Sequence, residues 1–178
     1  ESDTAGVNTV QEILNASNIK SGKVTYAMAP FDLKQLIDEI ATGLRSNAVK
    51  KNLAFNVDTG STPITVTGDR AQLVNVYKNL IDNSIKYTPS GSVSVSLMET
   101  PGKAVFKIED TGVGITTEDM AHLFTEGGHG KESQKINTES TGFGLYIVKN
   151  IIDAHKGKVW AESEGAGKGS RFFVELPV

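Results

Sequence analysis

The chain has 178 residues, of which 38% are hydrophobic and 22% charged, and its formal net charge is −3. This composition is sufficient for one folded core and excludes a disordered chain. The mildly acidic balance provides no overall basic field, so we expect no nucleic acid partner. Cysteine is absent, which excludes disulfides and thiolate metal sites. No apolar run approaches the roughly 18–20 residues of a membrane helix.

Helical periodicity and strand alternation organise the first half of the chain. Apolar residues at helical spacing predict that residues 1–20 form the end of a helix. Asp32 is a suitable N-cap for the next helix, and Asp69 begins another. The sequence Thr88-Pro89-Ser90-Gly91 ends that helix, because it combines a proline with turn residues. The strands predicted in this half are 24–29, 53–57 and 64–67.

The second half begins with a hairpin and continues into a glycine-rich turn at 110–114. A short helix follows and ends near Phe124, residues 125–141 are expected to form a mobile loop, and a helix runs from Gly142 to about His155. Hairpins and helices mix without strict alternation, so we expect an α+β fold, a two-layer α/β sandwich. The strands predicted in this half are 92–99, 104–109, 158–163 and 170–176.

The first motif with a chemical meaning is the run from Asn79 to Tyr87. Asn79, Asn83 and Lys86 are four and three residues apart, so they share one helix face. Amide oxygens are suitable hard ligands for Mg²⁺, which keeps several waters and shares phosphate oxygens. A solvated polar face would show the same pattern, so this motif alone leaves both interpretations open.

Two glycine motifs follow, at residues 109–115 and 140–145. In the first, Gly112 and Gly114 allow either a tight turn or close backbone approach to a ligand. Asp110, at the end of a predicted strand, can accept a hydrogen bond from an exocyclic amine. In the second motif, backbone N–H groups at a helix start attract phosphate. Either motif alone also fits a simple turn or helix start.

Taken in order, these motifs resemble the N box, G1 box, F box and G2 box of the histidine kinase catalytic domain. That domain belongs to the GHKL superfamily, which also holds gyrase, Hsp90 and MutL. The resemblance covers roughly residues 5–178 and implies the Bergerat fold, a mixed, mostly antiparallel sheet of about five strands packed on three helices. The matching segments are residues 79–89 (N box), 110–115 (G1), 123–124 (F) and 141–145 (G2).

The resemblance also implies a domain organisation. Residues 1–22 would be the C-terminal end of the dimerisation and phosphoacceptor helix with its linker, and residues 23–178 the ATP-binding catalytic domain. Residues 125–141 would form the ATP lid. The sequence departs from the family at two G2 positions, where Ser140 replaces a glycine and Phe143 a leucine.

The cofactors implied are ATP and Mg²⁺. By the resemblance, Asp110 receives the adenine amine with a water held by Ser170, while Asn83 binds Mg²⁺. Asn79 and Lys86 join Asn83 as the expected catalytic residues. The expected ATP-binding set is Asn79, Asn83, Lys86, Tyr87, Asp110, Gly112, Gly114, Ile115, Phe124, Lys131, Ser140, Thr141, Gly142, Phe143, Gly144, Leu145 and Ser170.

The implied reaction passes the γ-phosphoryl group of ATP to a histidine on a separate dimerisation domain, then to an aspartate of a response regulator receiver domain. The three histidines, His122, His129 and His155, lie outside any phosphoacceptor motif of the family, so the nucleophile is expected outside this chain. We expect a monomeric fragment of a homodimeric parent. The expected location is cytoplasmic, whether or not the parent is membrane-anchored.

Two alternatives lie within the superfamily: a hydrolytic ATPase of the gyrase or Hsp90 sort, and an anti-sigma serine kinase. Hydrolytic relatives place a glutamate four residues before the metal-binding asparagine, and the serine kinases also tend to carry it. Here Asn79 occupies that position, and an amide cannot act as a base. A third alternative is a scaffold that binds ATP, or nothing, and only docks partners.

Overall fold

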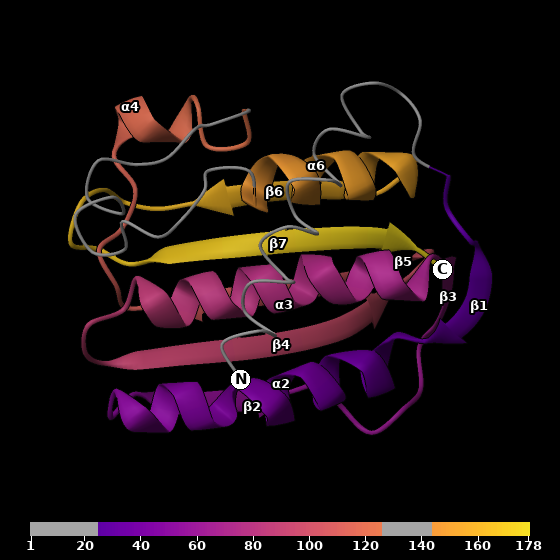
Figure 1. Ribbon diagram of the computed structural model, residues 1–178, viewed down its shortest axis with the longest axis horizontal. Helices are drawn as coiled ribbons and strands as arrows, with labels where there is room; N and C mark the ends of the chain where they lie inside the picture. Colours follow the sequence, from indigo (N-terminus) through magenta and orange to yellow (C-terminus); the bar gives the residue numbers. More distant parts are fainter. Residues whose placement is uncertain (1–24, 126–143) are drawn as a thin grey trace, which may run out of the picture.

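The computed structural model describes residues 25–125 and 144–178. A five-stranded sheet forms one layer, in the order β2-β4-β5-β7-β6 (Figure 1). β2 pairs in parallel with β4, whereas the other neighbouring pairs are antiparallel. The prediction of a mixed, mostly antiparallel sheet of five strands is therefore confirmed. The strands are β2 (Ala54–Asp58), β4 (Ser92–Thr100), β5 (Lys103–Asp110), β6 (Lys158–Glu162) and β7 (Ser170–Pro177).

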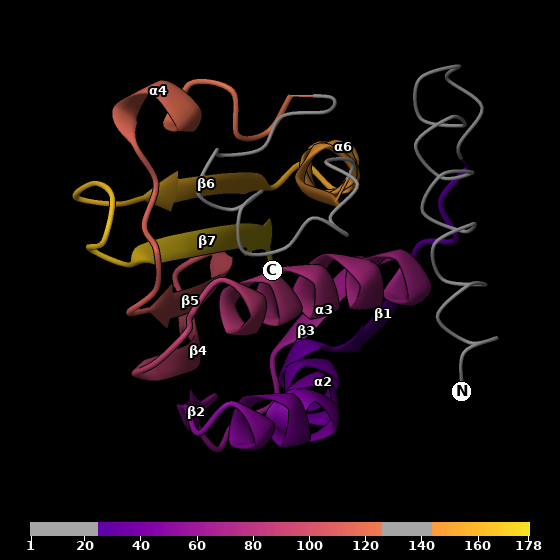
Figure 2. The same ribbon diagram turned by 60° about the vertical axis from the view of Figure 1, so that its left-hand side comes forward.

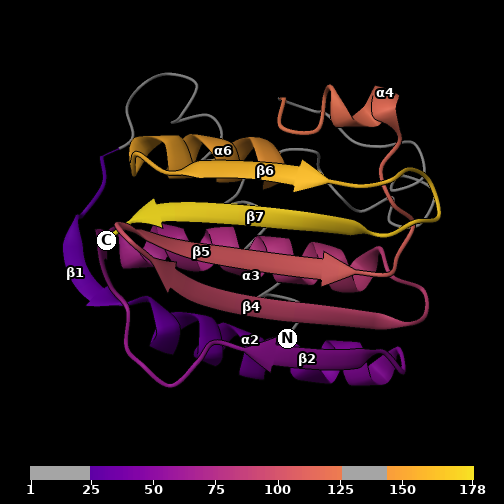
Figure 3. The ribbon, with the colours of Figure 1, turned by 180° about the vertical axis from the view of Figure 1, so that it is seen from behind.

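Three helices form the second layer, and all lie on the same face of the sheet, as the views from the front and from behind show (Figures 1 and 3). They are α2 (Leu33–Lys50), α3 (Arg70–Lys86) and α6 (Gly144–Ala154). Figure 2 shows α6 end-on, and α6 packs against α3. A single helical turn, α4 (Thr117–Met120), follows the end of β5. The two-layer α/β sandwich is thus confirmed.

The core lies between the two layers. Alternation in β5 buries Ala104, Phe106, Ile108 and Asp110 on the helix side. The same alternation that fills the core therefore places a carboxylate at the end of β5, beneath the helices. No helix among the described residues is long and apolar enough to cross a membrane.

Two aspartates begin the helices, as predicted. The Asp32 carboxylate caps α2 by accepting from Lys34 N–H at 3.0 Å, and Asp69 caps α3 by accepting from Gln72 N–H at 3.1 Å. Each satisfies a backbone donor that has no partner within its helix. These caps fix where the two longest described helices start.

The strand predicted at 24–29 is wrong in its position. The strand is β1 (Ala29–Asp32), which pairs with β3 (Thr65–Gly68) in a separate two-stranded sheet. Its register places Phe31 opposite Val66, so pairing with β3 determines the strand position rather than the local pattern. The helix predicted for residues 1–20 lies outside the described residues.

Tyr77 is fully buried in the core and packs edge-on against Phe106, with ring centroids 4.9 Å apart. Its hydroxyl is buried and has no hydrogen-bond partner within the described part of the chain. Burial raises the pKa of the Tyr77 hydroxyl far above its ordinary value. The aromatic ring therefore stabilises the core, while the hydroxyl carries a desolvation cost.

Tyr77→Phe is expected to raise the free energy of unfolding by about 1 kcal/mol, because a buried hydroxyl without a partner costs about 1–3 kcal/mol. Urea unfolding would measure the change. Tyr77→Leu is the control, which loses the aromatic contact with Phe106 and should be less stable than wild type. A clear loss of stability in the Phe variant would mean that the hydroxyl has a partner in solution.

Candidate functional site

Asp110, the last residue of β5, is 6% exposed and is held by three donors. Its Oδ1 accepts from Gly112 N–H at 2.9 Å and from Ser170 N–H at 3.2 Å, and its Oδ2 accepts from Ser170 Oγ at 3.0 Å. Burial is the largest influence and raises the pKa of the Asp110 carboxyl, while these hydrogen bonds partly offset it. The structure thus brings the predicted pair Asp110 and Ser170 into direct contact, because they are partners in the β5–β7 register.

Ser84 is a polar residue of this site that the sequence argument missed. Its side chain is 2% exposed on the buried face of α3, and its hydroxyl lowers the pKa of Asp110. The same hydroxyl does not reach regular hydrogen-bond geometry with any described residue. A buried polar atom without a partner is unusual and calls for a ligand or a water. A serine at a core-facing position of the N box is the signal that could have found it.

The G1 turn is packed tightly on the end of α3. A Cβ on Gly112 would lie only 2.3 Å from the Tyr87 carbonyl oxygen, so no larger residue fits there. The same carbonyl accepts from Val113 N–H at 3.1 Å. The predicted site residues Gly112 and Tyr87 are therefore brought together, and glycine permits the contact.

The turn between β6 and β7 supports the other side of the G1 turn. Gly114 has a φ of +72°, and a Cβ there would lie 2.1 Å from the Gly165 carbonyl oxygen. Gly167 N–H donates to the Val113 carbonyl at 2.7 Å, and Ile115 N–H donates to Ser163 Oγ at 3.0 Å. This support could not be predicted from the motifs, because the two segments lie far apart in sequence.

Asn79, on the polar face of α3, lies against the beginning of α6. Asn79 and Asn83 are both half-buried, and their side-chain amides have no hydrogen bonds among the described residues. A Cβ on Gly144 would lie 3.1 Å from the amide oxygen and nitrogen of Asn79, so the G2 and N boxes meet here. Lys86 instead pairs with Asp82 at 3.2 Å and is largely exposed.

These amides fit Mg²⁺ only together with a phosphate. Their oxygens are uncommitted within the described chain, and hard cations accept amide oxygen ligands. The described residues contain no group of three acidic or histidine side chains that could hold a metal ion. A cation here would therefore take its remaining ligands from phosphate and water.

Other predicted residues lie around this centre. The Phe124 and Phe172 rings pack edge-on, with ring centroids 6.3 Å apart. Leu145, in the first turn of α6, packs on the core. The rest of the predicted lid, beyond Thr125, lies outside the described residues up to Phe143. The predicted site residues affected are Lys131, Ser140, Thr141, Gly142 and Phe143.

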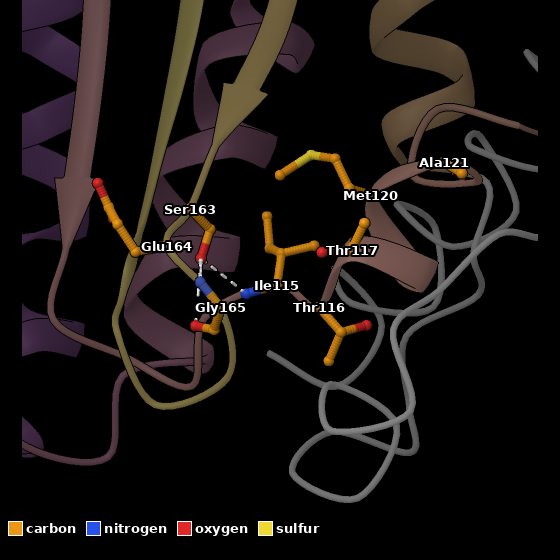
Figure 4. A pocket seen from close by; sticks show the side chains of 8 residues that line it. All are labelled: Ile115, Thr116, Thr117, Met120, Ala121, Ser163, Glu164 and Gly165. Carbon is orange, nitrogen blue, oxygen red and sulfur yellow. Dashed lines mark hydrogen bonds between the residues drawn. The ribbon is translucent and has the colours of Figure 1, made fainter.

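A pocket of about 330 Å³ opens beside the α4 segment (Figure 4). Ile115 and Met120 give it an apolar wall, and Glu164 is committed to Arg171 at 2.9 Å. Neither Asp110 nor the α3 amides line it, so it adjoins the candidate site without forming its polar part. The lining residues are Ile115, Thr116, Thr117, Met120, Ala121, Ser163, Glu164 and Gly165.

Comparisons with known proteins agree with this arrangement. Residues 68–178 match the family described as histidine kinase-, DNA gyrase B-, and HSP90-like ATPase. The methyl sulfide methyltransferase-associated sensor of Methanosarcina acetivorans is 34% identical over 172 residues, covering 94% of this chain and 17% of the relative. The adaptive-response sensory kinase SasA of Microcystis aeruginosa is 33% identical over 171 residues, covering 95% of this chain and 44% of the relative.

A solved structure agrees as well. Full-length ShkA in complex with AMPPNP superimposes with a TM-score of 0.82 at 25% identity, covering 99% of this chain and 36% of that chain. The fold and the polar site together define an ATP-binding domain. The chain belongs to the histidine kinase-, DNA gyrase B-, and HSP90-like ATPase family, and it is a catalytic ATP-binding domain of the sensor histidine kinase type. It spans less than half the length of the curated relatives described above.

Asp110→Asn is expected to abolish most nucleotide affinity without harming the fold. The asparagine Oδ1 can keep both backbone N–H donors, and its Nδ2 can donate to Ser170 Oγ. An exocyclic amine would then meet a donor instead of an acceptor, at a cost of about 1.5–3 kcal/mol in ADP binding by calorimetry. The control is Glu109→Gln, at the neighbouring residue with an exposed side chain, and this variant should bind ADP normally.

The same variant has a pH signature in stability. Because the folded protein raises the pKa of Asp110, ionisation destabilises the fold as pH rises from the ordinary to the raised value. Asparagine does not titrate, so Asp110→Asn should be at least as stable as wild type at neutral pH. That advantage should disappear in acid, where Asp110 is protonated. A variant much less stable at neutral pH would contradict this account.

Proposed function

We propose that the domain binds Mg²⁺–ATP and transfers the γ-phosphoryl group to a histidine on a separate dimerisation domain of the same full-length protein. The observation that carries this proposal is the pair of uncommitted amides, Asn79 and Asn83, which lie one turn apart on α3, with Asn79 placed against Gly144. The pair offers phosphate and metal ligands while supplying no carboxylate that could activate water.

Adenine recognition is assigned to Asp110. The carboxylate is buried, fixed by Ser170 and Gly112, and its acceptor character suits the adenine amino group. A guanine would present a carbonyl oxygen at the same place, and two acceptors would repel. A site built to hydrogen-bond one group rejects analogues that lack it, so ATP and ADP should bind far better than GTP.

Phosphate and metal handling is assigned to the polar face of α3. Asn83 would hold Mg²⁺, Asn79 would support it, and the α6 start at Gly144 allows close backbone approach to phosphate. When bound, Mg²⁺ neutralises charge on the phosphate oxygens, which is a main part of phosphoryl-transfer catalysis. Lys86 could also contact the phosphates, because its exposed ion pair with Asp82 is weak.

The phosphoacceptor is proposed to lie outside this chain. His155 is 4% exposed; its Nε2 accepts from Asp69 N–H, and its Nδ1 lies 2.7 Å from the Ile151 carbonyl oxygen. Both ring nitrogens are therefore committed to the fold and neither can attack a phosphate. His122 is exposed but lies outside any phosphoacceptor motif.

The partners follow from this assignment. We infer that residues 1–22 end the dimerisation helix of a homodimeric parent and that residues 125–141 act as the ATP lid. After transfer to histidine, the phosphoryl group would pass to an aspartate of a response regulator receiver domain. Incubation with labelled ATP and a dimerisation domain of the same family tests this route, and acid-labile phosphohistidine is the expected product. Label that never reaches a histidine would refute it.

Asn83→Ala is expected to weaken Mg²⁺-dependent nucleotide binding more than metal-free ADP binding. Loss of a residue that supports a metal ligand typically costs about 10–100-fold, so loss of the ligand should cost at least about 10-fold. Calorimetry with and without Mg²⁺ separates the metal-dependent part of nucleotide binding from the metal-free part. Asn75→Ala, an exposed position earlier on α3, is the matched control. Equal effects of the two substitutions would defeat the assignment of Asn83.

The unmodified domain is expected to bind ATP but to hydrolyse it far more slowly than about 1 s⁻¹, a low value for an enzyme. General-base assistance is typically worth about 10²–10⁴-fold, and Asn79 cannot supply it. Asn79→Glu should therefore raise hydrolysis in a phosphate-release assay. Asn79→Gln lengthens the side chain without adding a carboxylate, so it controls for crowding against Gly144 and should not raise hydrolysis. Rapid hydrolysis by the unmodified domain would favour the alternative function, a GHKL-type ATPase.

A further inference from the structure

The segment that leads into β1 is attached to the start of α3. Ala27 N–H donates to Asp69 Oδ2 at 2.9 Å, and the Tyr26 ring lies edge-on to the His155 ring at 5.4 Å. Burial, followed by the negative charge of Asp69, raises the pKa of the Tyr26 hydroxyl. We call Tyr26, Ala27, Asp69 and His155 the linker hub.

Within the linker hub, Asp69 joins three parts of the chain. Its Oδ1 caps α3 through Gln72 N–H, its Oδ2 binds Ala27, and its own N–H donates to His155 Nε2 at 2.9 Å. Both Asp69 and His155 are buried, at 8% and 4% exposure. Hydrogen bonds to groups as buried as Asp69 and His155 are costly to leave unmade, so the three parts should move together.

His155 connects the linker hub to the last turn of α6. Because Nε2 accepts, the ring proton is on Nδ1, which donates to the Ile151 carbonyl at 2.7 Å. The ring also packs on the backbone of Gly68, where a Cβ would lie 2.8 Å from His155 Cδ2. The end of α6 is thereby fixed against the start of α3 with little free space.

The same two helices meet again at the nucleotide site. Asn79 is ten residues beyond Asp69, about 15 Å along the helix, and it faces Gly144 at the start of α6. A helix transmits a shift at one end to the other as a nearly rigid body. A shift at the linker hub would therefore change the spacing between Asn79 and Gly144.

We propose that Asp69 and His155 are positioning residues that couple the segment at Tyr26 and Ala27, which leads into β1, to the nucleotide site. Docking of that segment through Ala27 and Tyr26 favours the spacing of α3 and α6 that receives nucleotide. By reciprocity, nucleotide binding favours docking of the segment. This coupling rests on the proposed function, since it acts on the nucleotide site assigned above.

Ala27→Pro tests the proposal, because it removes the N–H that binds Asp69 Oδ2. Met28→Pro is the matched control: Met28 is 47% exposed and its N–H makes no hydrogen bond within the described chain. Without nucleotide, Ala27→Pro should shift the amide NMR signals of Asn79 and Gly144, and the control should not. Shifts confined to the neighbours of residue 27, or equal in both variants, would overturn the proposal.

Nucleotide affinity provides the second readout. Coupling between sites is typically about 5–150-fold, so Ala27→Pro should weaken ADP binding at least about 5-fold. His155→Phe keeps a ring but lacks the acceptor, so it should weaken ADP binding to a similar extent. His155→Gln restores an acceptor and should recover part of the lost ADP affinity. Unchanged ADP affinity in both Ala27→Pro and His155→Phe overturns the coupling. If wild type itself binds no ADP, the proposed function fails, and the amide shifts still decide whether the hub positions the helices.

Discussion

The structure depends on the way α3 is fixed at both ends while one face is buried. At its start, Asp69 caps the helix and joins it to the segment around Ala27 and to His155. At its end, the Tyr87 carbonyl lies against Gly112 so closely that only glycine fits. Between these anchors the apolar face is packed in the core, which leaves the helix little freedom to rotate or slide. The polar face of α3 is therefore presented in one orientation.

Polar groups without protein partners are concentrated on this helix. Among the described residues, the buried side-chain atoms that lack hydrogen bonds are Tyr77 Oη and Ser84 Oγ, and both lie on α3. The half-buried amides of Asn79 and Asn83 are also uncommitted. Such groups cost stability, and proteins keep them where function needs them. Under the proposed function, Ser84 beside Asp110 would face the base of the nucleotide and the amides of Asn79 and Asn83 its phosphates, whereas nothing explains the Tyr77 hydroxyl in this way.

The sequence was sufficient for features that depend on local chemistry. Helix caps at Asp32 and Asp69, the β4–β5 hairpin and the alternation that buries Asp110 follow from residue type and period. Features that depend on distant pairing could not be predicted. β1 lies at Ala29–Asp32 because β3 pairs with it there, and the pattern of the segment alone favoured earlier residues. The contact of Ser163 with Ile115 spans 48 residues, and no motif rule encodes it.

The candidate site likewise has features that the sequence predicted and features that it did not. The resemblance pointed to Asp110, Ser170 and the amides, and the structure brings Asp110 next to Ser170 and Asn79 next to Gly144. The boxes alone did not point to Ser84, which faces the same carboxylate, or to the pairing of Lys86 with Asp82, although core-facing position and i,i+4 spacing on a helix carry both signals. Under the proposed function, Asn79 supplies no base, and the domain would hold nucleotide for a nucleophile on a separate domain. For such a domain, reactivity depends on the placement of α3 relative to the incoming partner. Under the proposed coupling, the linker hub would set that placement, because there Ala27 contacts the residue that caps α3 and Tyr26 contacts the residue that follows α6.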